Sequence, residues 1–170
     1  MRLLKSVLAI TVSVAALNTI KAQDIEGSTE YMAASGAKLY VGGHFEKADR
    51  RVVNNIAMFE GGKWSGLKKG VDGNVRCIAA SGNNVFVAGD FTFVDKSESG
   101  SVKSYNIAMW DGAKWNSLGD QTVDRQVFAI ATSGNTTYIG GNFQKVAGAI
   151  ATKGVAKWDG KKWSDVGNAQ

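Results

Sequence analysis

The chain has 170 residues, of which 44% are hydrophobic and 21% are charged, with 20 Lys and Arg against 15 Asp and Glu. Three of the bases lie in the first 22 residues, which hold no acid, so the remainder carries 17 bases and 15 acids and lacks the basic excess typical of nucleic-acid binding. A single cysteine, Cys77, excludes an internal disulfide, so packing alone has to stabilise the fold.

The N-terminal residues have the layout of a secretory signal peptide. Arg2 and Lys5 precede an unbroken apolar and small run over residues 7–17, and a polar stretch then ends at Ala22. A membrane-spanning helix needs about 20 apolar residues, and this run is shorter. We therefore predict a leader that is cleaved after Ala22, and an exported product of residues 23–170 that is secreted or periplasmic and has no membrane span.

One motif recurs three times along the predicted product. It consists of a strand that ends in Ser-Gly, a second strand that ends in small residues, and then a polar residue followed by Phe; the copies are residues 31–45, 77–91 and 129–143. Each copy is followed by a strand that ends in an aromatic residue and a strand that opens with tryptophan, in residues 55–64, 106–115 and 154–163. The starts of the motif are 46 and 52 residues apart, a period typical of β-propeller repeats.

Each repeat is expected to form four antiparallel strands. Its runs of β-branched and aromatic residues are separated by turn residues, and no proline interrupts them. Two tight turns are expected per repeat, the first at Ser-Gly and the second at Glu60-Gly61, Asp111-Gly112 or Asp159-Gly160. The chain is thus predicted to be all-β, with four-stranded units at about 29–67, 75–118 and 126–167.

These repeats resemble the kelch motif of β-propellers. In that motif a glycine doublet ends the second strand, an aromatic residue ends the third strand and a tryptophan opens the fourth. The corresponding pairs here are Gly42-Gly43, Ala88-Gly89 and Gly140-Gly141. Over residues 30–167 the pattern is similar to repeats of secreted bacterial proteins described as galactose-oxidase-like or kelch-like. The resemblance implies three propeller blades and leaves the function open, because propellers carry enzymes, receptors and scaffolds alike.

The number of repeats is smaller than a closed ring requires. Closed propellers have about 4 to 8 blades, and three blades would expose edge strands and apolar faces. Three arrangements stay open: a homodimer that completes a six-bladed ring, a sequence that belongs to a longer array, or a β-trefoil, which also has three four-stranded repeats.

The residues that catalysis or metal binding would need are scarce. Galactose oxidase has a copper site with two histidines and two tyrosines, whereas His44 is the only histidine here, which excludes such a site within one chain. Zinc sites with several His or Cys ligands are excluded on the same count. We therefore predict no catalytic residue, metal or cofactor, a packing role for Cys77, and packing roles for the five tryptophans.

Candidate ligand-binding residues lie after the second strand and in the loops. His44 aligns with Asp90 and Asn142, a position typical of turn residues that bond nearby backbone, or alternatively of residues on one rim that contact a ligand. The connection between the second and third strands varies in length among the repeats, and repeat proteins commonly bind ligands on the face that accepts insertions. The candidates in these connections are Arg50, Arg51 and Lys96. Acidic residues accompany them, which is also typical of a solvated rim.

These observations predict an exported, non-enzymatic binding or scaffold module whose variable-loop face contacts a protein or a glycan. The alternative is a carbohydrate-binding or carbohydrate-active protein, either a trefoil lectin or a propeller enzyme that uses rim carboxylates. A repeat remnant without a ligand is the plain structural alternative. No nucleic-acid partner is expected.

Overall fold

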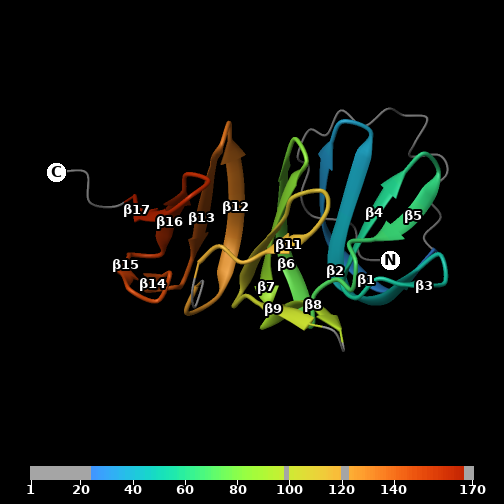
Figure 1. The fold of residues 1–170 in the computed structure, drawn as a ribbon, viewed down its shortest axis with the longest axis horizontal. Helices are drawn as coiled ribbons and strands as arrows, with labels where there is room; N and C mark the ends of the chain where they lie inside the picture. The colour runs from blue at the N-terminus through green and yellow to red at the C-terminus, as the bar shows by residue number, and fades with distance from the viewer. Residues whose placement is uncertain (1–23, 98–99, 120–122, 167–170) are drawn as a thin grey trace.

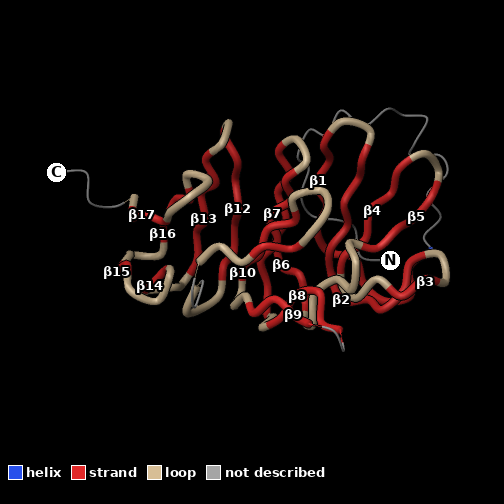
Figure 2. The backbone as a smooth tube through the Cα atoms, viewed as in Figure 1, coloured by secondary structure: helices blue, strands red, loops and turns tan. Residues whose placement is uncertain are grey.

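The structure is a computed structural model that describes residues 24–97, 100–119 and 123–166, so the predicted leader lies outside the described residues. The described chain is all-β and forms three large antiparallel sheets that stand side by side (Figures 1 and 2). In these ranges we find no helix with the length and apolarity needed to cross a membrane.

Each sheet takes its strands from one repeat, in chain order from the first strand to the fourth. Sheet 1 contains β1 (Ile25–Ser35), β2 (Lys38–Ala48), β4 (Ile56–Glu60) and β5 (Lys63–Gly66). Sheet 2 contains β6 (Asn74–Ser81), β7 (Asn84–Asp90), β10 (Ile107–Trp110) and β11 (Trp115–Asn116). Sheet 3 contains β12 (Val127–Ser133), β13 (Thr136–Gly141), β16 (Val155–Trp158) and β17 (Trp163–Asp165). The predicted four-stranded antiparallel units are thus confirmed.

The connections between the second and third strands contain short strands that the sequence did not predict. These are β3 (Arg51–Val52), which pairs with β2, and the two hairpins β8 (Phe93–Ser97) with β9 (Gly100–Lys103) and β14 (Lys145–Val146) with β15 (Ile150–Ala151). All of them lie along the lower edge of the molecule in Figure 1, opposite the tight turns at 36, 82 and 134. We call this end of the molecule the loop face.

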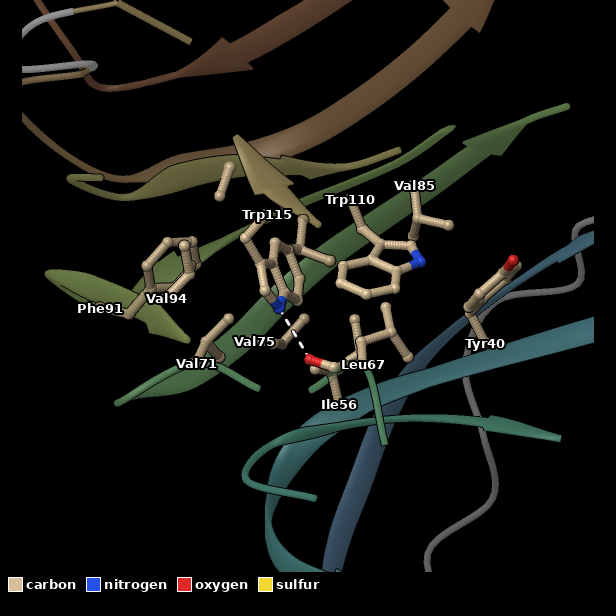
Figure 3. Close-up of a cluster of buried hydrophobic side chains, with 12 residues drawn as sticks. Tyr40, Ile56, Leu67, Val71, Val75, Val85, Phe91, Val94, Trp110 and Trp115 are labelled. Atoms are coloured by element: carbon tan, nitrogen blue, oxygen red, sulfur yellow. Dashed lines mark hydrogen bonds between the residues drawn. The ribbon is translucent and has the colours of Figure 1, made fainter. Parts of the chain in front are cut away.

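The three sheets bury apolar side chains against their neighbours. One cluster joins sheets 1 and 2 and includes Tyr40, Ile56, Val85 and Trp115 (Figure 3). A second cluster joins sheets 2 and 3 and includes Phe86, Ile107, Ile139 and Trp163. The first strands β1, β6 and β12 are neighbours in turn, so each sheet contacts the next along its length.

A pair of aromatic rings marks the junction of the third and fourth strands in every sheet. The rings are cross-strand neighbours with centroids 5.1 to 5.6 Å apart, and the pairs are Phe59–Trp64, Trp110–Trp115 and Trp158–Trp163. The tryptophan that opens the fourth strand is 3% exposed in all three sheets. The structure therefore agrees with the packing role predicted for these residues.

Three hydrogen bonds repeat between successive sheets. The indole N–H of the fourth-strand tryptophan donates to a carbonyl of the preceding sheet, from Trp115 to Leu67 O at 2.8 Å and from Trp163 to Leu118 O at 2.5 Å. A serine hydroxyl at the end of the first strand donates to the next turn, from Ser35 to Gly82 O at 2.8 Å and from Ser81 to Gly134 O at 3.4 Å. An asparagine amide donates to the start of the next repeat, from Asn55 to Val71 O and from Asn106 to Val123 O.

A β-bulge interrupts the first strand of each sheet at the same position. The extra residues are Glu30, Arg76 and Phe128, each placed where the pairing register with the second strand shifts. The bulge brings the first strand very close to the second glycine of each doublet. A Cβ built on Gly89 would lie 1.9 Å from Asn74 O, and one on Gly141 would lie 2.2 Å from Gln126 O, so only glycine fits there.

The described strands do not close into a barrel. A β-trefoil would place six strands of its three repeats in one barrel, so the arrangement gives the trefoil alternative no support.

Candidate functional site

A cleft of about 580 Å³ opens on the loop face between sheets 2 and 3. Its volume lies in the range of about 300–1,000 Å³ that is typical of small-molecule sites. The described residues that line the cleft are Tyr105, Asn106, Val123, Asp124, Gln144, Lys145 and Gly148. Polar and aromatic groups from both sheets therefore meet in one concave surface.

The walls of the cleft are held in place by backbone contacts. The carboxylate Oδ1 of Asp124 accepts hydrogen bonds from the backbone N–H groups of Gln144 at 2.9 Å and Lys145 at 3.0 Å. Val123 pairs with Val146 in an isolated β-bridge, and the Asn106 amide donates to Val123 O at 2.9 Å. The link between the two sheets is therefore bonded on both sides, which favours a preformed site over one that orders on binding.

The groups in the cleft suit a polar ligand. Tyr105 contributes an aromatic ring, and the ammonium of Lys103 lies 5.0 Å from the centre of that ring. Gln144 and Lys145 are exposed and offer hydrogen-bond donors beside the Asp124 carboxylate. A ligand with several hydroxyl or amide groups and one flat face would match this combination.

The corresponding place between sheets 1 and 2 is occupied by side chains of the protein. There Asp72 accepts from the backbone N–H groups of Thr92 and Phe93, as Asp124 does in the next repeat. Asp95, however, accepts from the Lys69 N–H at 3.3 Å and forms an ion pair with Lys68 at 3.3 Å. The equivalents of Asp95 and Lys96 in sheet 3 are Ala147 and Gly148, which lack these side chains. Because these side chains are absent, the place between sheets 2 and 3 stays open as the cleft.

The predicted residues His44, Asp90 and Asn142 lie at equivalent positions of the repeats: His44 lies within β2, Asp90 is the last residue of β7, and Asn142 directly follows β13. His44 is opposite Ser28, Asp90 is opposite Asn74, and the Asn142 N–H donates to Gln126 O at 3.1 Å. All three side chains are exposed. They lie beside the bulges of the first strands, away from the residues that line the cleft.

Of these three residues, Asp90 has the most contacts. Its Oδ2 accepts from Arg76 Nε at 2.6 Å and from the terminal guanidinium nitrogen at 2.5 Å, and its Oδ1 accepts from Gln126 Nε2 of the next sheet at 3.5 Å. The hydrogen bond with Asp90 and the charges of Asp90 and Glu30 raise the pKa of Arg76. Asp90 thus bonds the side chains of Arg76 and Gln126, from two different sheets.

The three bulge residues add a second polar surface that the sequence did not predict. Glu30 and Arg76 attract one another across sheets 1 and 2, and Phe128 of sheet 3 is 59% exposed. We call this surface the inner-strand row; it consists of Glu30, Arg76, Asp90, Gln126 and Phe128. Bulges commonly re-aim side chains in this way beside functional sites.

The predicted residues Arg50, Arg51 and Lys96 are exposed on the loop face. Arg50 lies in the turn between β2 and β3 with φ of 63°, and Arg51 begins β3. Lys96 lies in β8, with its ammonium 5.8 Å from the centre of the Phe93 ring. In the part of the chain that the structure describes, no contact joins these three residues into one site.

Cys77 lies in β6 with 6% exposure, and its thiol donates to Val127 O of sheet 3 at 3.8 Å. Burial raises the pKa of the thiol to about 12, although a backbone hydrogen bond at Ala88 lowers it slightly. The thiolate is the reactive form, so at pH 8 almost none is present in the folded protein.

We expect Cys77 to resist a thiol reagent such as Ellman's reagent at pH 8 in the native protein, and to react within seconds to minutes in 6 M guanidinium chloride. Absorbance at 412 nm measures the released thiolate. Equally fast labelling of native and denatured protein would contradict the buried position.

The sequence was also compared with known proteins. No protein-family model matches the chain, and no curated protein is significantly similar to it. What the structure establishes is an all-β protein of three repeated antiparallel sheets with a cleft between the second and third.

Proposed function

We propose that the three sheets are kelch-like blades of an exported protein of the β-propeller kind. The order of strands in each sheet, the adjacent first strands and the tryptophan bonds between successive sheets support this assignment. Closed propellers have about 4 to 8 blades, so we propose that these three blades form part of a ring.

We propose further that the protein is a non-enzymatic binding module that takes its ligand on the loop face. The observation that carries this proposal is the 580 Å³ cleft between sheets 2 and 3, lined by Tyr105, Asp124 and Gln144. A concave site of this size favours a ligand that inserts a small polar group, as one sugar residue of a glycan does, over a flat protein surface. The predicted glycan partner is therefore favoured over a protein partner.

We expect Tyr105→Ala and Gln144→Ala to weaken glycan binding by about tenfold or more each, because each removes a side chain that lines the cleft. A glycan array identifies the ligand, and calorimetry with the purified glycan measures the affinities. Lys63→Ala is the matched control, since Lys63 is exposed at the opposite end of sheet 1.

The outcome of these measurements separates the cleft from the inner-strand row. Binding that is lost in Phe128→Ala but unchanged in Tyr105→Ala would move the site to the inner-strand row. An unchanged affinity of both Tyr105→Ala and Gln144→Ala for a glycan that the wild type binds would contradict the proposal.

A further inference from the structure

A second cleft, with a volume of about 370 Å³, lies between sheets 2 and 3 at the end of the molecule that carries the tight turns, the upper end in Figure 1. Its walls include Phe86 and Met109 of sheet 2 and Thr137 and Trp158 of sheet 3. We call it the turn cleft. Its described lining has no residue in common with the cleft of the loop face, so the two clefts lie at opposite ends of the same junction.

A polar side chain is buried in the wall of the turn cleft. Thr137 is 1% exposed and lies opposite Trp158, on the face of β13 that packs against sheet 2. Its equivalents in sheets 1 and 2 are Leu39 and Val85, which are buried and apolar. Among the described residues, none forms a hydrogen bond with the Thr137 hydroxyl. Since polar groups of buried residues nearly always have a partner, this hydroxyl is available to a ligand in the cleft.

The tryptophan of the turn cleft is also more accessible than its equivalent in sheet 2. Trp110 packs between sheets 1 and 2 and is 9% exposed, whereas Trp158 is half-buried and lines the cleft. Two side chains on the opposite wall are shorter than the residues at the same positions of sheet 1: Phe86 in place of Tyr40, and Asn84 in place of Lys38. The shorter side chains leave room for a ligand to reach the indole ring.

Polar groups surround the opening of the turn cleft. Asn84, which begins β7, and Asn135, in the turn before β13, are both exposed. Asp159 Oδ1 accepts from the backbone N–H groups of Lys162 at 2.8 Å and Lys161 at 2.9 Å, and these bonds lower the pKa of the carboxyl group. The opening therefore offers amide, carboxylate and ammonium groups around apolar walls.

We propose that the turn cleft is a second binding site, which takes the acetamido group of an N-acetylated sugar. The methyl of this group suits the apolar walls of Phe86, Met109 and Trp158, and its amide carbonyl can accept a hydrogen bond from the Thr137 hydroxyl. A hexose without the acetamido group would place hydroxyl groups against the same walls and lose their hydration, so it is expected to bind more weakly. The choice of a sugar rests on the proposed glycan partner, whereas the site itself is independent of the loop-face cleft.

The test is a pair of titrations of the purified, ¹⁵N-labelled protein, one with N-acetylglucosamine and one with glucose, followed by NMR. N-acetylglucosamine should shift the signals of the Trp158 indole N–H and of the Asn135 side-chain amide. Glucose should require a concentration at least about tenfold higher for the same shifts. Absence of these shifts with N-acetylglucosamine, or equal shifts with both sugars, would overturn the proposal.

Two variants test the residues of the turn cleft. Thr137→Val introduces the side chain that sheet 2 has at Val85, so the fold should be kept, and loss of the hydroxyl should raise the dissociation constant by about tenfold, as expected for one hydrogen bond. Asn135→Ala changes an exposed turn residue and should raise it several-fold. An unchanged dissociation constant in Thr137→Val with an unchanged melting temperature would overturn the assignment of the hydroxyl.

Tyr105→Ala separates this site from the loop-face cleft. The shifts of the Trp158 and Asn135 signals should persist in Tyr105→Ala, because Tyr105 lines the other cleft. Shifts that are confined to the loop face and lost in this variant would support the proposed function and overturn the second site. Shifts at the turn cleft alone would support the second site and count against the proposed function.

Discussion

Replacing Trp115 by alanine is expected to lower the free energy of unfolding by about 3–5 kcal/mol, the range measured for buried tryptophan and phenylalanine. The indole is 3% exposed, packs on Trp110, and fills the space between sheets 1 and 2 (Figure 3). The substitution removes this packing and also the indole donor to Leu67 O, which keeps its bond from the Gly70 N–H at 3.1 Å. Urea denaturation followed by circular dichroism measures the loss.

A pair of phenylalanine substitutions separates the ring from its hydrogen bond. Trp115→Phe keeps an aromatic ring but loses the N–H donor, and since Leu67 O still accepts from the Gly70 N–H, the expected cost is the net value of one hydrogen bond, about 0.5–1.5 kcal/mol. Trp64→Phe should cost less, because the Trp64 N–H makes a longer bond, 3.4 Å to Asp24 Oδ2, among the described residues. Equal losses in the two variants would show that the carbonyl bond between sheets contributes nothing.

Gly141→Ala is expected to destabilise the protein by about 1–3 kcal/mol, the range for overpacked sites. The added Cβ would lie 2.2 Å from Gln126 O, so β12 and β13 would have to separate beside the bulge. Backbone atoms cannot move aside as a flexible side chain does, so the cost falls on the strand pairing itself.

The adjacent Gly140→Ala is the control for this substitution. No atom lies within 4 Å of a Cβ built at Gly140, and its φ is not in the left-handed region. The change should therefore be neutral or stabilising by up to about 1 kcal/mol, because alanine restricts the unfolded chain. Thermal unfolding compares the two variants directly, and similar midpoints would contradict the close approach at Gly141.

The four-stranded units were predictable because their turns have strong local signals. Ser35-Gly36 and Asp111-Gly112 are typical of tight hairpins, and positive φ values at Gly36 and Gly112 show why glycine is needed there. The bulges and the strands β3, β8, β9, β14 and β15 were missed. A bulge adds one residue without changing composition, and strands of two to five residues are too short to show a clear periodic pattern.

The candidate site was predicted only in its general location. The variable connections predict ligand binding on the loop face, and this stays a prediction; the cleft lies on the same face. The sequence favours Arg50, Arg51 and Lys96 because they are charged residues of the variable connections, whereas the cleft depends on Asp124 and on the small residues Ala147 and Gly148. The Val-Asp pair that recurs at 71–72 and 123–124 is a usable sequence signal. Each of its aspartates accepts hydrogen bonds from two backbone N–H groups at equivalent positions of the loop that follows the second strand.

The bulges on the first strands place side chains on the surface that take no part in the strand pairing that stabilises the fold. Glu30, Arg76 and Phe128 occupy one backbone position but have an acidic, a basic and an aromatic side chain, and none of the three is fully buried. Since a bulged residue takes no place in the strand ladder, its identity is nearly free of folding constraints. Mutation can therefore change the exposed surface at these positions with little effect on strand pairing, which lets one scaffold vary its surface in evolution.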